Sequence, residues 1–191
     1  MFEKLLFSLA GSFDKAGIGY MVIGGQAVLL YGNPRLTRDI DITVALDVDS
    51  YDKIEQVCKE SSLKILPKEP LKFVSETRVL PCEDMGSKIR VDFIFSYTEY
   101  ERQATKRAKK VMLNKRPVSF ASAEDVIIHK LFANRAIDIE GVRGILIKHK
   151  EKIDLVYTRK WLKDFSVISD KENILEIFEN LYKEQPKEGF R

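Results

Sequence analysis

One short segment constrains the fold of this chain more than any other. An apolar strand over 19–23 runs into two glycines, a short helix follows over 25–31, and a second strand is expected over 39–46. A strand, a glycine turn and a helix in immediate succession are typical of α/β proteins. Glycines also let backbone N–H groups approach an anion, and the start of a helix carries partial positive charge. The segment therefore predicts an α/β unit with an anion site at Gly24 and Gly25.

A pair of acids opens the second strand, and a third acid lies on a later one. Asp39 and Asp41 are two residues apart, so on a strand they point to the same face. Two neighbouring carboxylates repel each other, and a divalent cation between them would relieve this repulsion. Asp92 lies in the alternating segment 88–95, which is predicted to be another strand. Three carboxylates on adjacent strands would hold two Mg²⁺ ions, the arrangement used for in-line attack on a phosphate.

Each of these features alone has an ordinary explanation. A Gly-Gly pair is most often a turn, an Asp-x-Asp pair is usually a solvated strand end, and a lone acid such as Asp92 is commonly a surface residue at a strand edge. Their combination in this order is far more specific, with the run Arg-x-Thr-x-Asp-Ile-Asp leading into the second strand. The combination favours a site for phosphate and metal over three unrelated structural features.

Residues 18–146 resemble the nucleotidyltransferase superfamily, whose fold is shared with the palm of polymerase beta. The Gly-Gly-x-Ala start and the Arg-x-Thr-x-Asp-Ile-Asp run are similar to the group that includes type IV abortive-infection toxins. The segment 122–138, with its Ser-x-Glu-Asp-x-x-x-x-Lys pattern, resembles the start of that group's helical half. The resemblance implies an α/β (α+β) fold. A mixed sheet with flanking helices would form residues 1–121, and a helical bundle packing against this core would form residues 122–191.

The resemblance also implies an activity and the residues that carry it. Such a protein would move a nucleoside monophosphate from a nucleoside triphosphate to an acceptor and release pyrophosphate. Asp39 and Asp41 would bind both metal ions. Asp92 would complete the ion site nearest the acceptor and help the acceptor hydroxyl lose its proton. The ions would be Mg²⁺, with Mn²⁺ as the alternative, and Gly24 and Gly25 would hold the phosphates.

Lys130 is the candidate cation of the helical half. The resemblance favours an ammonium that reaches the triphosphate and stabilises its negative charge. The structural alternative is a lysine whose stem lies along the apolar stripe of its helix while its charge reaches solvent. Two departures from the group affect these roles. Gly25 stands where many members carry serine, so backbone amides must do more to bind phosphate, and Gly141 stands where relatives often carry an acid.

Length and composition limit the classes of protein to which this chain can belong. The chain has 191 residues, of which 45% are hydrophobic and 32% charged, values that suit a soluble globular protein with a sizeable core. No apolar run is long enough to cross a bilayer, and no membrane association is expected. The N-terminal segment carries Glu3 and lacks a basic start, so it does not read as a signal peptide. Cys58 and Cys82 have no metal-ligand spacing, and a reducing cytoplasm is the expected setting.

Local patterns predict the remaining elements. Helices are expected over 2–17, from Asp49 or Ser50 to 60, over 97–107, from Ser122 onward, and over 137–147, 150–164 and 170–184. Strands are expected over 76–81 and 88–95, joined as a hairpin, and over 110–113 and 117–120, with a turn at 114–115. Segment 61–74 shows no clear pattern, and residues 185–191 read as a frayed tail.

The sequence holds no pattern that identifies the acceptor, apart from one run of basic residues. Residues 102–116 contain seven cations and no acid. The run is either a solvated face or a landing site for a polyanionic acceptor such as RNA. A protein hydroxyl and a small molecule are the other acceptors considered. Two rival functions stay open: a catalytically weak nucleotide-binding or toxin–antitoxin-type partner of the same fold, and a nucleic-acid-binding protein that uses the run alone. Carboxylates without metal repel phosphate, which argues against the last.

Overall fold

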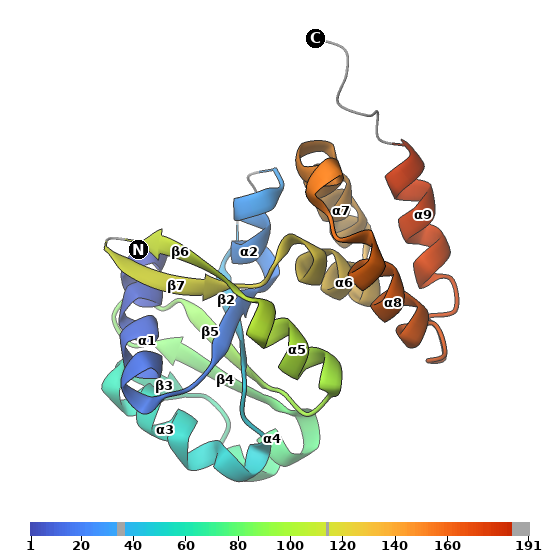
Figure 1. The fold of residues 1–191 in the computed structure, drawn as a ribbon. Helices are drawn as coiled ribbons and strands as arrows, with labels where there is room; N and C mark the ends of the chain where they lie inside the picture. The colour runs from blue at the N-terminus through green and yellow to red at the C-terminus, as the bar shows by residue number, and fades with distance from the viewer. Residues whose placement is uncertain (34–36, 114, 185–191) are drawn as a thin grey trace. The chain divides into compact units, whose positions relative to one another are not determined.

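The computed structural model describes residues 1–33, 37–113 and 115–184. Over these residues the chain folds into two compact units (Figure 1). The first comprises residues 1–26 and 37–121, and the second comprises residues 27–33 and 122–184. No helix in these ranges is long and apolar enough to cross a membrane.

A seven-stranded mixed sheet forms the frame of the first unit. The strands are β1 (Tyr20–Ile23), β2 (Asp39–Val44), β3 (Leu63–Ile65), β4 (Val79–Asp84), β5 (Arg90–Phe95), β6 (Lys109–Leu113) and β7 (Arg116–Phe120). They lie in the order β3-β4-β5-β2-β1-β7-β6. β2 pairs antiparallel with β1 and parallel with β5, whereas β4 pairs antiparallel with β5. The mixed sheet with flanking helices confirms the fold class expected from the sequence.

Helix α1 (Phe2–Ala16) packs on one face of this sheet. Phe13 of α1 stacks on Tyr20, with ring centroids 4.4 Å apart, and meets the edge of Phe93 at 6.0 Å. All three side chains are buried. Because successive residues of a strand point to opposite faces, Phe93 and Asp92 face opposite sides of the sheet. This aromatic part of the core therefore lies on the face opposite the acids.

The second unit is helical. Its helices are α6 (Ala123–Ala133), α7 (Ala136–His149), α8 (Leu155–Phe165) and α9 (Ile174–Glu184), with the 3-10 turn η2 (Lys150–Lys152) between α7 and α8. Helix α2 (Gly24–Tyr31) begins in the first unit and continues into the second. Ser122 caps α6 as its pattern predicts, because its Oγ accepts a hydrogen bond from the N–H of Asp125 at 3.2 Å. The Tyr157 hydroxyl of α8 donates to the buried Asp125 carboxylate at 2.7 Å, which joins α8 to α6.

The segment without a clear pattern contains β3 and an unexpected helix. Helix α4 runs over Pro70–Thr77, and the strand expected over 76–81 is wrong at its start, because β4 begins only at Val79. Proline in the first turn suits a helix start, since its missing N–H has no intrahelical partner there. The helix buries only Val74, and its exposed apolar residues Leu71 and Phe73 obscure the helical period.

Other boundaries differ in small ways. Helix α3 (Tyr51–Glu60) follows the 3-10 turn η1 (Val48–Ser50), and Asp47 caps that turn in place of the expected Asp49 or Ser50. Helix α5 (Glu99–Arg107) begins with a capping box at Thr98. The expected turn residue 114 and the expected tail 185–191 lie outside the described residues.

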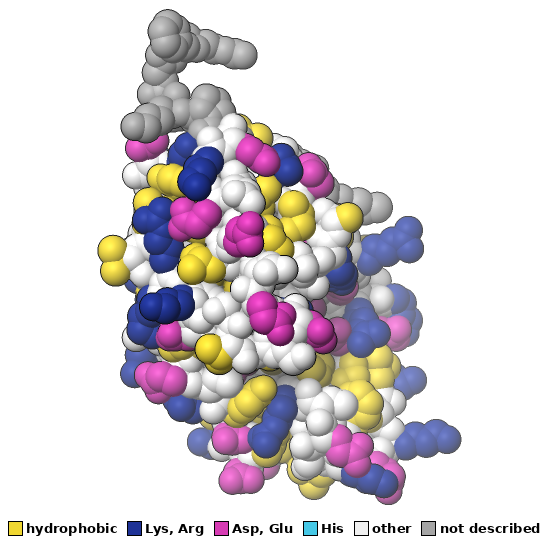
Figure 2. Space-filling view, turned by 90° about the vertical axis from the view of Figure 1, so that its right-hand side faces the viewer, with side chains coloured by type: hydrophobic (Ala, Val, Ile, Leu, Met, Phe, Trp, Pro, Cys, Tyr) yellow, Lys and Arg dark blue, Asp and Glu magenta, His cyan; other side chains and the backbone are white. Residues whose placement is uncertain are grey.

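The surface carries both charges. On the face seen in Figure 2, Lys and Arg side chains are interspersed with Asp and Glu. The basic run follows the same pattern, because two of its cations have acidic partners. Arg102 lies 3.5 Å from Glu99, and Arg116 lies 3.6 Å from Asp14. The run is therefore not one uninterrupted cationic surface.

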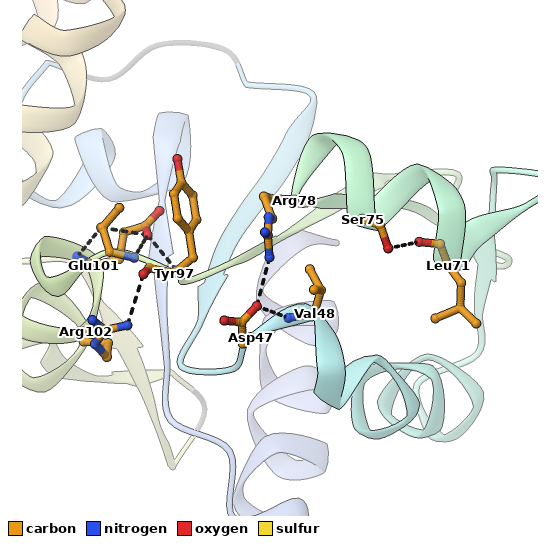
Figure 3. A network of polar contacts seen from close by, with 9 residues as sticks. Asp47, Val48, Leu71, Ser75, Arg78, Tyr97, Glu101 and Arg102 are labelled. Carbon is orange, nitrogen blue, oxygen red and sulfur yellow. Dashed lines mark hydrogen bonds and ion pairs between the residues drawn. The ribbon is translucent and has the colours of Figure 1, made fainter. Parts of the chain in front are cut away.

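Arg78 fixes the C-terminal end of α4. It caps the helix in the left-handed conformation, with φ of 62°. Its guanidinium donates to Asp47 Oδ1 at 2.9 Å and lies 5.3 Å from the ring centroid of Tyr97 (Figure 3). Asp47 follows β2 and Tyr97 follows β5. The end of α4 is thus tied to the loops after the two strands that carry the predicted acids.

Candidate functional site

The three predicted acids lie on one face of two adjacent strands. The register of the parallel pair β2–β5 places Asp41 directly beside Asp92, and Asp39 beside Arg90. Side chains paired across neighbouring strands share a face, and so do residues two apart on one strand. Asp39, Asp41 and Asp92 therefore point to the same side of the sheet, as their spacing indicates. Their roles as metal ligands stay a prediction.

Gly24 lies against the carboxylate of Asp41. Ile23, the last residue of β1, pairs with Asp41, which brings the glycine turn to the acid. A Cβ built on Gly24 would overlap Asp41 Oδ2 and lie 2.9 Å from its Cγ. Gly24 also has φ of 62°, in the left-handed region that glycine adopts without strain. Both the space and the backbone conformation therefore call for glycine at this position.

The start of α2 is also tied to the segment before the acids. The buried side chain of Gln26 donates from Nε2 to Thr37 Oγ1 at 2.7 Å. Gly25, between this contact and the turn, is buried as well. The hydrogen bond holds the first turn of α2 beside the approach to Asp39, so the glycines and the acids form one local structure.

Arg90 is the residue of this site that the sequence reading missed. Its Nε donates to Asp92 Oδ1 at 2.8 Å and to Oδ2 at 3.1 Å. The pKa of the Arg90 guanidinium is raised, first by the hydrogen bond to Asp92 and by the charge of Asp92, and further by Asp39 and Asp41. The negative charges of all three acids thus converge on one cation. The spacing of Arg90, two residues before Asp92 on the same strand, is the signal that identifies it.

The donor set fits a hard divalent cation. Carboxylate oxygens are preferred ligands of Mg²⁺ and Mn²⁺, and three carboxylates share this face beside the Gly24 turn. Among the described residues, no three His, Cys, Asp or Glu side chains already form a metal-binding cluster. Asp92 is held by Arg90 instead, at 2.8 Å. A metal ion at Asp92 would therefore compete with the guanidinium for the same carboxylate.

Lys130 lies in the second unit, in a buried ion pair. Its Nζ is 2.8 Å from Asp138 Oδ1, and the two side chains are only 6% and 1% exposed. Arg135 Nε also donates to Asp138, at 2.6 Å. A Cβ on Gly141 would lie 3.0 Å from Lys130 Cδ and Cε, so the glycine leaves room for the lysine stem. The alternative of a lysine whose charge reaches solvent is therefore wrong, whereas a role in phosphate binding stays a prediction.

This ion pair predicts a loss of stability in acid. Burial raises the pKa of the Asp138 carboxyl, but the hydrogen bonds and charges of Arg135 and Lys130 lower it by more, so the net pKa is lowered. Such a carboxyl contributes stability that is complete above its unfolded pKa, about 3.9, and is lost as pH falls through the folded value. We expect unfolding free energies measured by urea to fall below about pH 4. The variant Asp138→Asn should lack this part of the pH dependence. If its unfolding free energy falls with pH as steeply as that of wild type, the Asp138 carboxyl is not the group responsible.

Comparison with known proteins identifies the fold. No protein-family model matches the sequence, and no curated protein matches it either. The chain is similar to the solution structure of the antibiotic-resistance factor ANT(2'')-Ia, with a TM-score of 0.57, 15% identity, and coverage of 95% of this chain and 92% of that one.

Two further solved structures agree. An antigenic nucleotidyltransferase-like protein from Paracoccidioides brasiliensis matches with a TM-score of 0.55, 16% identity and coverage of 97% and 93%. The lincomycin-bound lincosamide antibiotic adenylyltransferase LnuA matches with a TM-score of 0.51, 17% identity and coverage of 74% and 96%. At these identities the likeness shows the fold: this chain has the nucleotidyltransferase fold.

Proposed function

We propose that this protein is a metal-dependent nucleotidyltransferase. The observation that carries the proposal is the register that sets Asp39, Asp41 and Asp92 on one face, beside the Gly24 turn. Backbone N–H groups at a helix start bind phosphate, and neighbouring carboxylates hold the ions that neutralise it. Structures of the same fold include an adenylyltransferase and a complex of ANT(2'')-Ia with adenylyl-2"-tobramycin. They support adenylyl transfer as the reaction and ATP as the first donor to test.

The proposed reaction is an in-line displacement at the α-phosphorus of the triphosphate. The oxygen of an acceptor hydroxyl forms a bond to this phosphorus, the bond to the bridging oxygen of the β-phosphate breaks, and pyrophosphate leaves with the electron pair. Asp92 accepts the hydroxyl proton, and the N–H groups of Gly24 and Gly25 orient the phosphates. Mg²⁺ or Mn²⁺, held by the three carboxylates, would supply charge stabilisation for the phosphate oxygens.

Mg²⁺ together with ATP should raise the melting temperature. A ligand that binds only the folded state stabilises it by about 2.7 kcal/mol at a concentration one hundred times its Kd. The rise should need both components, because the carboxylates repel a triphosphate without metal. Thermal unfolding with each nucleoside triphosphate, alone and with Mg²⁺ or Mn²⁺, measures this. Release of pyrophosphate in the presence of a cell extract measures turnover. The absence of any rise with every nucleotide and both metals would remove the proposed function.

Gly24→Ala should damage the site beyond its cost to the fold. An alanine in the left-handed conformation costs about 1–2 kcal/mol, and its Cβ would also displace the Asp41 carboxylate. Gly17→Ala is the matched control, because Gly17 has φ of 64° and nothing lies within 4 Å of its added Cβ. Both variants should have a lower melting temperature than wild type. Only Gly24→Ala should also lose the rise in melting temperature that Mg²⁺ and ATP produce. Equal responses in the two variants would show that the contact with Asp41 is unimportant.

A nucleotide-binding protein with weak turnover, for example a toxin–antitoxin-type partner, is the second candidate. Two observations favour it: Gly25 offers no hydroxyl to the phosphates, and Arg90 engages the carboxylate of Asp92. This candidate predicts the same melting rise with Mg²⁺–ATP but no pyrophosphate release with any cell fraction. The pair of measurements therefore separates the two functions.

A further inference from the structure

We propose that the acceptor is a small hydroxylated molecule with an apolar face, and that it binds in a pocket between α4 and the strands β4 and β5. The inference rests on the proposed function, since it names the substrate class of that same site.

The pocket has the size of a small-molecule site. Its volume is about 570 Å³, within the range of about 300–1,000 Å³ found for such sites. Its lining includes Phe73 and Glu76 of α4, Leu66 after β3, Pro81 of β4 and Arg90 of β5. All of these residues belong to the first unit.

Two of the lining residues place the pocket beside Asp92. Pro81 pairs with Asp92 across β4 and β5, so the two side chains face the same side of the sheet. Arg90 precedes Asp92 by two residues and donates to its carboxylate. A molecule in the pocket therefore lies over β4, one strand spacing of about 4.8 Å from the strand of the acid that would accept its proton.

The apolar part of the lining is partly exposed to solvent. The side chain of Leu66 is 43% exposed and that of Phe73 is 38% exposed. Both line the same pocket. Four of the nine lining residues are apolar and five are charged, and pockets for organic ligands combine apolar walls with polar groups that fix the ligand's orientation. An apolar ligand face would cover both side chains and remove this surface from water.

The charged part of the lining disfavours a polyanion. Lys68, Lys72 and Arg90 share the pocket with Glu69 and Glu76. Lys72 lies 3.9 Å from Glu69, and Arg90 lies 2.8 Å from Asp92, so two of the three cations already have acidic partners. The acids would repel a run of phosphates, whereas a small molecule with few charges meets groups of both signs.

The part of the basic run that lies on β6 is at the far edge of the sheet. β6 forms the edge opposite to β3, four strand spacings from β5, a separation of about 19 Å. Lys109 and Lys110 of β6 are exposed there. A polyanion that binds at the β6 edge is therefore not brought next to Asp92 by that contact. The structure therefore favours the pocket over the β6 edge as the acceptor site.

The wall formed by α4 is held in place at its end. Val74 is buried, and Arg78 ties the C-terminus of the helix to Asp47 and Tyr97 (Figure 3). A wall fixed in this way needs little ordering when a ligand binds, which favours affinity for a small molecule.

The variant Phe73→Glu tests the pocket, and Leu71→Glu is its matched control. Both residues lie on α4, and Leu71 is 59% exposed but outside the pocket lining. A cell extract is divided into a small-molecule filtrate and a retained fraction of RNA and protein. Each fraction is incubated with enzyme, Mg²⁺ and ATP labelled at the α-phosphate. We expect wild type and Leu71→Glu to label a compound in the filtrate and Phe73→Glu to lose at least about tenfold of that labelling, a change of 1.4 kcal/mol.

The Mg²⁺–ATP melting rise separates the two proposals. It should be the same in wild type and both variants, which shows that the nucleotide site is intact. Leu66→Glu, a second change in the lining, should repeat the loss if Phe73→Glu proves unstable. The inference is overturned if Phe73→Glu and Leu66→Glu label the filtrate as wild type does. It is also overturned if label appears only in RNA and is lost on Lys109→Glu with Lys110→Glu. A missing melting rise in wild type would instead overturn the proposed function.

Discussion

Asp41→Asn should lower the rate of nucleotidyl transfer by roughly 10²–10⁴-fold. Asp41 is the central acid of the site, because it pairs with Asp92 on the neighbouring strand and lies against Gly24 at the glycine turn. The amide keeps the shape of the side chain but removes the negative charge that would hold a metal ion. The initial rate of pyrophosphate release, measured at saturating ATP over a range of Mg²⁺ concentrations, gives the effect on turnover.

The loss in Asp41→Asn must be separated from a loss of folding. Asp52→Asn serves as the control, since Asp52 is an exposed acid on α3. Both variants should melt close to wild type without ligand, because surface and half-buried acids rarely carry large folding energies. Only Asp41→Asn should lose the Mg²⁺–ATP response. If Asp41→Asn transfers nucleotide at the wild-type rate, the three acids do not take part in the reaction, although they share one face of the sheet.

Lys130→Ala should lower the free energy of unfolding of the second unit by up to about 3–5 kcal/mol. The substitution removes one partner of a buried ion pair and leaves the Asp138 carboxylate, which is 1% exposed, without its closest buried cation. Arg135 still donates to Asp138 but is itself 71% exposed. Urea denaturation of wild type and variant, followed by circular dichroism, measures the change.

Two control variants would distinguish a structural role of the Lys130 ammonium from a role in binding the triphosphate. Lys59→Ala removes an exposed ion pair with Glu55 and should cost at most about 1 kcal/mol. Lys130→Met combined with Asp138→Leu should recover much of the loss, because apolar side chains can replace a buried pair. Titrations with ATP and AMP complete the test. A fall in ATP affinity alone, at unchanged stability, would assign the ammonium to the triphosphate and contradict the structural role.

The segment around the glycine turn could be predicted from sequence because its information is local. The alternating acids at Asp39 and Asp41 define a face of one strand, and the alternation around Asp92 defines a face of another. Parallel pairing of the two strands then brings the acids together, as the register shows. The strand and the helix over Tyr20–Tyr31 agree with their patterns to within one residue, and the two glycines expected as a turn form the start of α2.

The rest depends on contacts that no local pattern records. Helix α4 buries only Val74, so its period of 3.6 residues is weak, and its docking relies on Arg78 reaching two distant loops. Lys130 and Asp138 lie on different helices, and their pairing needs the space left by Gly141. Tertiary packing decides such contacts, which is why the lysine reads in sequence as a cation available to a ligand or to water.

The two edges of the sheet also bear on how this protein meets other copies of itself. An edge strand exposes unpaired N–H and C=O groups, and another chain can add to them. β3 offers only three residues for such pairing, and β6 begins with the exposed side chains of Lys109 and Lys110. A second copy approaching β6 in register would bring like charges together, and at β3 it would gain few hydrogen bonds. Lys109 and Lys110 of the basic run thus disfavour edge-to-edge pairing of β6 with another chain, an effect that requires neither RNA nor nucleotide.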